Sequence, residues 1–278
     1  MKRLLSIELQ KIWKNKASRV LTITYFGLLS LLTLLAIVKF DFGPFHIDAS
    51  QQGVFNFPYI WHFNSYIADY ISFFLAIIIV SMMANEYSYG TLKQNLIDGL
   101  SKKEFILSKF LTVLFFSALA TTFVFLVSLV LGLKFSTYTE FRIVFSQMDY
   151  LLAYFIKLVC YFSFCLFLGI LIRRSAFALG FLILWYFIEK ISFGILKYKV
   201  FNKSTNVDAV YNFFPLESMS NLLVEPYSRL SVVKAIGSQV GIDNVKDYSV
   251  HWYAIAIALA WTAIFVYGSY FLLKKRDL

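Results

Sequence analysis

The chain has 278 residues, of which 59% are hydrophobic and 15% are charged, and its mean hydropathy is +0.69. Soluble domains contain about 45–50% apolar and about 25% charged residues, so the composition excludes a soluble globular protein and indicates an integral membrane protein. The formal net charge of +10 does not indicate nucleic-acid binding, because the basic residues cluster at the ends of apolar segments.

Residues 2–14 (KRLLSIELQKIWK) have the pattern of an amphipathic helix. Leu5, Leu9 and Ile12 share one face of this helix, and Lys14 lies on the other. A basic helix of this kind is expected to lie on the membrane surface; the alternative is a cytoplasmic extension of the first span. The apolar run that follows is long and lacks a small-residue cleavage site, so we expect no cleaved signal peptide.

Six apolar segments are long enough to cross a bilayer, which takes about 20 residues of helix. Because six is an even number, both termini face the same side of the membrane. The stretches on that side are richer in Lys and Arg than the opposite loops, which places the termini in the cytoplasm. We therefore expect a single all-α transmembrane domain over residues 1–278. Its predicted spans are 19–39, 66–85, 107–132, 150–172, 175–197 and 251–273.

A long loop at 198–250 is predicted on the extracytoplasmic side. Within it, residues 210–223 (VYNFFPLESMSNLL) are apolar and aromatic but too short to cross the membrane. They are expected to form a helix or a re-entrant segment that is interrupted at Pro215. The loop also contains the glycosylation sequon Asn202-Lys203-Ser204, a motif short enough to arise by chance.

The polar stretch 86–106 joins the second and third spans and begins with signals for a short helix over residues 91–98. Gly90 is expected to end the second span, because glycine is common just after a helix end. Thr91 and Gln94 match a T-x-x-Q capping box, which satisfies the first backbone N–H groups of a helix. The apolar side of the expected helix consists of Leu92, Leu96 and Ile97, and its polar side consists of Lys93, Gln94 and Asp98.

A second helix is expected directly after the first. Gly99 ends the short helix, and Ser101 and Glu104 then match an S-x-x-E capping box at the start of the third span. A helix of two turns is barely stable by itself and needs a packing partner. The residues alone leave two alternatives open: a docking site for another protein, or a connecting loop that touches only lipid headgroups.

This stretch resembles the cytoplasmic loop of ABC-2 type transporter permeases. The matching segments are EYSYGTLK at 86–93 and LIDGLSKKEFILSKFL at 96–111, in which a Glu is followed by Gly-Thr-Leu, a short helix, a Ser-basic pair and a Lys that enters the third span. Six spans, a basic surface helix and a large outer loop before the last span are also similar to that family. Many members have Pro or Thr before a Ser-Arg pair, where this chain has Leu100 followed by Ser101-Lys102-Lys103.

The resemblance implies a function in transport. Residues 91–98 would be a coupling helix that binds a separate ATP-binding subunit, present in two copies, with Glu86 at the hinge to the second span. ATP and Mg²⁺ would belong to that subunit, because this sequence has no G-x-x-x-x-G-K-[ST] motif; we expect no cofactor and no enzymatic activity on this chain.

The family also implies an exporter of twelve spans, completed by a second copy or a sister permease, in the cytoplasmic membrane of a bacterium. The substrate is not specified by the sequence, although abundant Phe and Tyr suit a lipid, a peptide or a hydrophobic drug. Two rival functions remain: a non-transporting assembly or sensory component coupled to an ABC ATPase, and a polytopic membrane enzyme. A membrane enzyme would need a catalytic cluster at the depth of the spans, and the sequence has no recognisable cluster of that kind.

Four charged residues are expected in or near the spans, where ionisable groups are costly and functional by default. Lys157 and Glu189 have similar depths in neighbouring antiparallel spans, so we expect an ion pair between them. Its role is either structural, by neutralising two charges in lipid, or a contact with substrate or protons. Lys190 is expected to extend toward the outer surface, and Asp69 faces either a pathway or water.

Neither the histidines nor the cysteines follow the spacing of a metal site. Cys160 and Cys165 point in different directions on one helix, which predicts buried free thiols. His62 and His251 each adjoin a tryptophan and are expected in the aromatic belt at the membrane interface. His46 falls in an outer loop.

Overall fold

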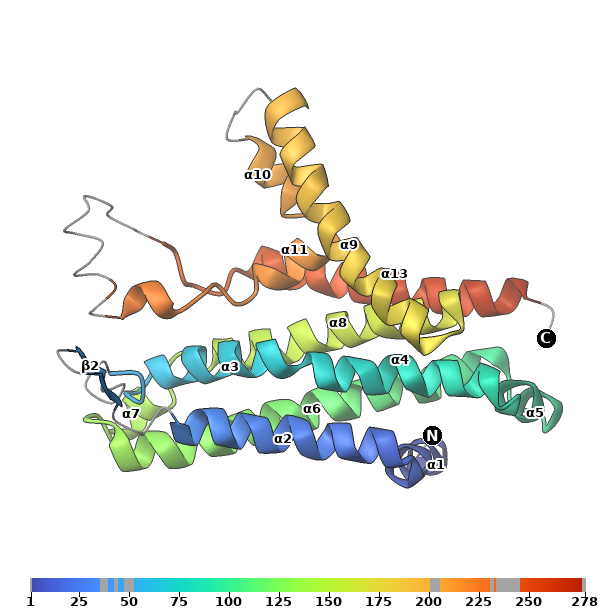
Figure 1. The fold of residues 1–278 in the computed structure, drawn as a ribbon, viewed down its shortest axis with the longest axis horizontal. Coiled ribbons are helices and arrows are strands. Elements are labelled where there is room, and N and C mark those ends of the chain that lie inside the picture. The colour runs from blue at the N-terminus through green and yellow to red at the C-terminus, as the bar shows by residue number, and fades with distance from the viewer. Residues whose placement is uncertain are drawn as a thin grey trace.

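The computed structural model describes residues 2–35, 40–42, 45–47, 53–200, 206–230, 233 and 246–276. These residues are almost entirely helical (Figure 1), which confirms the all-α membrane fold. Within these described ranges, five helices are long and apolar enough to cross a bilayer, and one bent helix pair makes a sixth candidate span. The end of the first predicted span, 36–39, and the sequon at 202–204 lie outside the described residues.

Most of the long helices run side by side along the long axis of the molecule (Figure 1). The bent pair, α3 and α4, changes direction by 44° at Ser72. The helices of this bundle are α2 (Lys16–Leu35), α3 (Tyr59–Ile71), α4 (Phe73–Ser88), α6 (Lys102–Phe135), α8 (Asp149–Ile172) and α13 (Trp252–Lys275).

Short elements occupy the ends of the bundle and the outer loop. Both termini and the short helix between α4 and α6 lie at the same end (Figure 1), which agrees with an even number of spans. The short elements are α1 (Lys2–Lys14), a two-stranded antiparallel ribbon of β1 (Phe40–Phe42) and β2 (Phe45–Ile47), α5 (Thr91–Ile97), α7 (Phe141–Val144), η1 (Leu196–Val200), α10 (Asn206–Tyr211), α11 (Pro215–Ser220) and η2 (Tyr227–Arg229).

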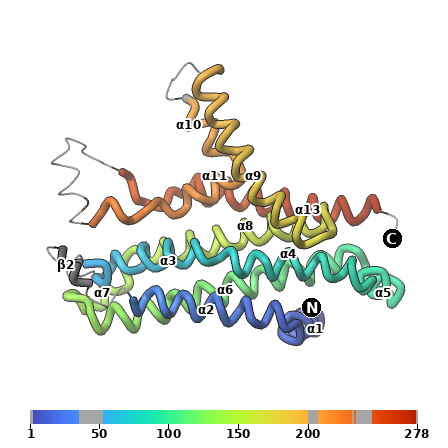
Figure 2. The backbone as a smooth tube through the Cα atoms, in the orientation of Figure 1, coloured from blue at the N-terminus to red at the C-terminus, as the bar shows by residue number. Residues whose placement is uncertain are grey.

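Helix α8 is the centre of the bundle, whereas α9 (Ser175–Ile195) leaves it. In the most apolar 18-residue stretch of the segment that ends with α8, 72% is buried inside the structure. In the corresponding stretch of the segment that begins with α9, only 11% is buried. Figure 2 shows α9 diverging steeply from the other helices, with α10 at its far end. Cys160 and Cys165 are both buried and unpaired within α8, which confirms the prediction of free thiols.

Helix α1 crosses α2 instead of extending it. In Figure 2, α1 is seen almost end-on while α2 lies across the view. The chain turns at Asn15, whose side-chain oxygen accepts a hydrogen bond from the backbone N–H of Ser18 at 3.2 Å, as an N-cap does. This geometry favours the surface helix over a straight extension of the first span.

The outer segments are attached to the bundle by specific hydrogen bonds. Pro215 begins α11, as expected for a proline that interrupts the apolar stretch, and Trp261 Nε1 of α13 donates to the carbonyl of Phe213 at 2.9 Å. His62 does not lie in an interfacial belt: it is fully buried and bonded to the carbonyl of Val224 at 2.7 Å. The reason is that the outer loop folds back over α3, which the sequence does not reveal.

Candidate coupling site and outer cavity

A buried cluster of charges lies at the end of the bundle that carries the termini. Lys109 Nζ of α6 is 2.6 Å from Glu8 Oε2 of α1 and 2.6 Å from Glu86 Oε1 of α4. The Lys109 side chain is completely buried, and the two carboxylates are 7% and 4% exposed. One ammonium group therefore joins three helices that are far apart in the sequence.

Two further residues complete the cluster around Glu86. Lys11 Nζ lies 2.9 Å from Glu86 Oε1, and the Thr91 hydroxyl of α5 donates to Glu86 Oε2 at 2.6 Å. Burial alone would lower the pKa of Lys11, but the carboxylates of Glu8 and Glu86 hold it above its usual value. Glu86 thus lies near the end of α4, just before α5, and both its oxygens are bonded.

The capping of α5 differs from the prediction. Its N-cap is Gly90, in the left-handed conformation with φ +67°, and Thr91 is the first helical residue. The Thr91 hydroxyl donates to Glu86, and the Gln94 N–H donates to the Gly90 carbonyl at 3.2 Å. The predicted box between Thr91 and Gln94 is therefore wrong, while the position of Gly90 just after α4 is as expected.

The start of α6 follows the sequence prediction closely. The Ser101 hydroxyl accepts a hydrogen bond from the Glu104 backbone N–H at 3.2 Å, and Glu104 accepts one from the Ser101 N–H at 3.0 Å, which confirms the capping box. Gly99 has φ +96° and ends the turn after α5. Lys102 Nζ binds the carbonyl of Arg276 at 3.0 Å and so joins α6 to the end of α13.

The apolar side of α5 divides between two environments. Leu92 is 2% exposed and Leu96 packs against the hydrophobic core, so both belong to the protein's own fold. Ile97 is 75% exposed, as is Tyr89 at 74%, just before the helix. The outward surface of this hairpin includes Tyr89, Lys93, Gln94, Ile97, Asp98 and Lys103.

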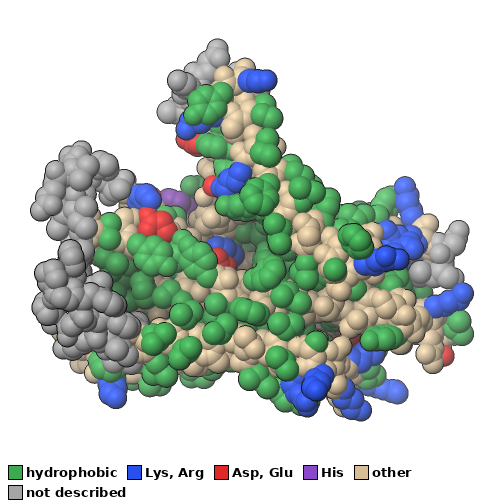
Figure 3. Space-filling view, viewed as in Figure 1, with side chains coloured by type: hydrophobic (Ala, Val, Ile, Leu, Met, Phe, Trp, Pro, Cys, Tyr) green, Lys and Arg blue, Asp and Glu red, His purple; other side chains and the backbone are tan. Residues whose placement is uncertain are grey.

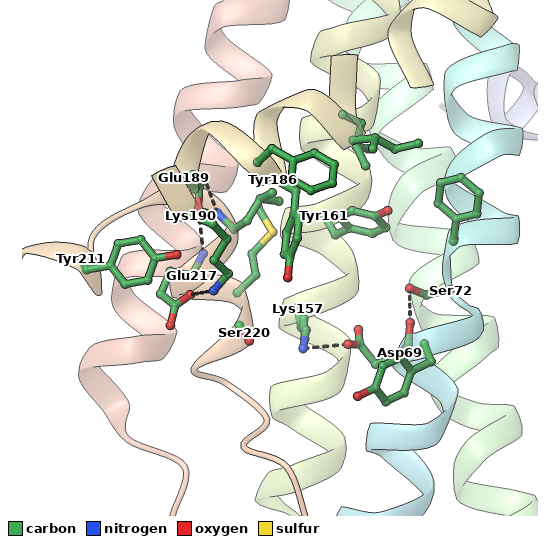
Figure 4. A pocket seen from close by; sticks show the side chains of 17 residues that line it. Asp69, Ser72, Lys157, Tyr161, Tyr186, Glu189, Lys190, Tyr211, Glu217 and Ser220 are labelled. Atoms are coloured by element: carbon green, nitrogen blue, oxygen red, sulfur yellow. Dashed lines mark hydrogen bonds and ion pairs between the residues drawn. The ribbon is translucent and has the colours of Figure 1, made fainter. Parts of the chain in front are cut away.

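A cavity of about 430 Å³ lies on the other half of the molecule, between α9, α8, α11 and the α3–α4 break. All four charged residues that were expected at the spans line it: Asp69, Lys157, Glu189 and Lys190. Figure 4 shows them with several tyrosines around the cavity, and Figure 3 shows a hollow beneath the diverging helix with charged atoms at its floor. The sequence placed these charges in separate spans but did not predict a common cavity.

The expected ion pair between Lys157 and Glu189 is not formed. Lys157 Nζ binds Asp69 Oδ2 at 2.8 Å (Figure 4), and both side chains are largely buried. The Lys157 partner comes from α3 because α9 diverges from the bundle (Figure 1) and Glu189 lies against the start of α11. The bend at Ser72 lies three residues after Asp69. The backbone carbonyl of Asp69 accepts two hydrogen bonds from Ser72, one from its N–H at 3.1 Å and one from its hydroxyl at 2.6 Å.

Glu189 instead binds the start of α11. Its carboxylate accepts hydrogen bonds from the backbone N–H groups of Leu216 at 3.1 Å and Glu217 at 3.2 Å, and from Trp185 Nε1 at 2.7 Å. Lys190 forms an ion pair with Glu217 Oε2 at 3.2 Å and its side chain is 47% exposed, so it only partly extends outward. Glu189 and Lys190 therefore attach the outer segment to α9.

Sequence reasoning missed several members of both sites. Glu8 is the single acidic residue on a basic amphipathic helix, with Lys11 three positions later, and that exception was the available signal. Lys109 was noted only as a motif residue, although a lysine within an apolar span calls for a partner. Glu217 carried no signal, since it lies in a loop where a charge is unremarkable.

Comparison with known proteins gives two matches. The sequence profile of the family described as "ABC-2 family transporter protein" matches residues 7–278, which is nearly the whole chain. The chain is also 38% identical over 77 residues to the "Uncharacterized protein YhcI" of Bacillus subtilis (strain 168). That match covers 26% of this chain and 25% of the relative.

Proposed function

Because the chain belongs to the ABC-2 transporter family, we propose that it is the permease subunit of an exporter driven by a separate ATP-binding subunit. The family makes the chain a membrane transport component and not itself an enzyme. Permeases of this family normally work with ATP-binding subunits, and we propose two such subunits with ATP and Mg²⁺ bound to them. A second copy or a sister permease would complete the pathway.

The hairpin around α5 is the proposed docking surface. The single observation that carries this proposal is the contact of Thr91 with Glu86, since it connects the exposed helix to the buried cluster. A displacement of α5 is then transmitted through Glu86 to Lys109 at the base of α6 and to Lys11 on α1. A buried ion pair suits this role because it fixes one arrangement of the helices and is costly to break.

The exposed residues of the hairpin, and not its buried leucines, are the proposed contact with the ATP-binding subunit. Ile97 supplies an apolar anchor, and Lys93 and Asp98 supply charges that fix its orientation. Because Leu92 is buried in the permease itself, a change there would damage the fold before it affected docking.

The outer cavity is proposed to form part of the substrate path. The residues that line it suit an amphiphilic substrate. It combines the Lys157–Asp69 ion pair with aromatic and aliphatic side chains in the spans. Rigid-body movement of the helix bases would open this region alternately to the two sides. Among the classes considered, a lipid, a peptide or a hydrophobic drug fits such a lining.

The proposed location is the cytoplasmic membrane of a bacterium, with both termini inside. Basic residues gather at the end of the bundle that carries the termini and α5 (Figure 3), as the positive-inside rule requires of a cytoplasmic end.

The exposed face of α9 is the proposed contact with a second permease. It includes Phe187 and Ile191, which are 54% and 61% exposed.

Docking is tested by a pull-down of the tagged chain from native membranes. Ile97→Asp should lower the amount of copurifying ATP-binding subunit by at least about ten-fold, because an unpaired charge is costly in an interface. Phe141→Asp is the matched control, since Phe141 is 79% exposed at the opposite end of the bundle. An ATPase that is absent from the wild type, or retained equally by Ile97→Asp, contradicts the proposal.

Reconstituted liposomes then separate an exporter from a non-transporting component. If the complex is an exporter, a lipid or hydrophobic cation added to the liposomes should stimulate its ATP hydrolysis and move across the bilayer. Hydrolysis that no added amphiphile changes, together with retained docking, would favour the sensory or assembly alternative.

A further inference from the structure

A groove of about 640 Å³ lies beside α1, and neither Glu8 nor Lys11 of the buried cluster lines it. It is bounded by α1, α2 and α6. Its floor on the α1 side contains Leu5, Leu9 and Trp13, which are four residues apart and therefore form one stripe. On the α6 side it contains Phe116 and Leu119. The groove is thus lined by a continuous apolar surface between a surface helix and a membrane span.

A polar stripe runs along the edge of this groove. Ser6, Gln10 and Lys14 also recur every four residues on α1 and line the groove next to the apolar stripe. All three are exposed, and none has a side-chain hydrogen-bond or ion-pair partner among the described residues. By contrast, the Thr22 hydroxyl in the groove donates to the carbonyl of Ser18 at 2.8 Å and is already paired. The site therefore has an apolar floor and a hydrogen-bonding edge that ends in a cation.

The opposite side of α1 carries the buried cluster, so the groove is a separate feature. Glu8 and Lys11 face Lys109 and Glu86. This attachment holds α1 against the bundle and keeps the groove open beside it. Lys14 is one turn from Lys11 and lines both the groove and the pocket beside the cluster, but it has no carboxylate partner among the described residues.

We propose that this groove binds one anionic phospholipid from the leaflet on the side of the termini. An acyl chain lies on Leu9 and Leu119, and the headgroup phosphate is bound by Lys14 with hydrogen bonds from Gln10 and Ser6. The argument for this occupant is chemical complementarity: the apolar floor matches hydrocarbon, and its edge offers donors and a positive charge but no carboxylate. A surface helix lies at the level where acyl chains meet headgroups.

The test is lipid binding by the purified full-length chain, without any partner subunit. The delipidated protein is titrated with phosphatidylglycerol or with phosphatidylcholine of the same acyl chains, and bound lipid is counted by native mass spectrometry. The wild type should prefer phosphatidylglycerol. Lys14→Gln should weaken phosphatidylglycerol binding about five-fold, since one lysine contributes about that much to anionic-lipid binding. It should weaken phosphatidylcholine binding less, because the choline cation offsets the charge of the phosphate.

Two further variants make the result specific to the groove. Leu119→Trp fills the floor and should weaken the binding of both lipids, whereas Lys103→Gln removes an exposed charge outside the groove and should change neither. Equal binding of the two lipids by the wild type would overturn the anionic class, and wild-type binding by Lys14→Gln or Leu119→Trp would overturn the site. Because the ATP-binding subunit is absent from this experiment, its outcome is independent of the proposed coupling.

Discussion

Lys109 and Glu86 form a 2.6 Å ion pair in which the lysine is completely buried and the carboxylate is 4% exposed. Their positions are 23 residues apart, one near the end of α4 and the other in α6, with α5 between them. The pair therefore closes the base of the α4–α5–α6 hairpin. Glu8 and Lys11 extend it to α1, which makes this end of the bundle one connected unit.

Removal of the central lysine should be strongly destabilising. Lys109→Met leaves two buried carboxylates without their main partner, which typically costs about 3–5 kcal/mol. The purified protein should unfold at a clearly lower temperature in detergent. Lys103→Met, an exposed lysine on the same helix, should have almost no effect. If the two variants unfold alike, the cluster does not stabilise the fold.

The conformation at Gly90 should make it intolerant of a side chain. Its φ is +67° and no atom lies within 4 Å of the place that a Cβ would occupy, so Gly90→Ala meets backbone strain and no clash. The left-handed conformation costs about 1–2 kcal/mol for alanine. Gly27→Ala in α2, where the space is also open, should be neutral or stabilising. Thermal unfolding of the two variants compares these effects directly, and a neutral Gly90→Ala would contradict the turn geometry.

Lys157 should be energetically coupled to Asp69 and not to Glu189. A double-mutant cycle with Lys157→Met and Asp69→Asn should give an interaction of about 0.5–3 kcal/mol, as residues in direct contact do. The same cycle with Glu189→Gln should give almost none, because Glu189 binds the start of α11. The measurement is unfolding of each single and double variant. Coupling to Glu189 of equal size would restore the pairing expected from sequence.

The two cysteines should be inaccessible in the folded protein. Cys160 and Cys165 lie in the buried α8, so N-ethylmaleimide should label neither in native membranes and both after unfolding in SDS. A cysteine introduced at Phe141 on α7, where 79% of the side chain is exposed at the end of the bundle, should react without unfolding in the Cys-free chain. Rapid native labelling of α8 would contradict its central position.

The local signals in the sequence were sufficient for most of the secondary structure. Hydropathy identified the spans, because each must bury about 20 residues in lipid regardless of its neighbours. The Ser101–Glu104 capping box and the helix-ending Gly90 and Gly99 also followed from the sequence, since they depend on atoms within one turn. The family resemblance in 86–111 was likewise local, and the profile match over 7–278 confirms it.

Contacts between segments were decided only by the tertiary structure. Thr91 matched a capping box but lies inside the helix that begins after Gly90, and its hydroxyl donates to Glu86 because α4 brings a carboxylate within reach. Lys157 matched Glu189 in depth but binds Asp69, because α9 leaves the bundle. In both cases, the sequence supplied a group that needs a partner, and the packing of distant helices selected which partner it found.

The sequence by itself thus determined that this chain spans a membrane, where the helix that leads into the third span begins, and which family the chain resembles. These properties follow from the transfer of apolar residues into lipid and from backbone bonding within a turn, both of which act over short stretches of chain. The buried cluster, the outer cavity and the groove beside α1 follow instead from how helices cross and diverge. That arrangement depends on contacts between residues far apart in the sequence, and only the folded structure brings them together.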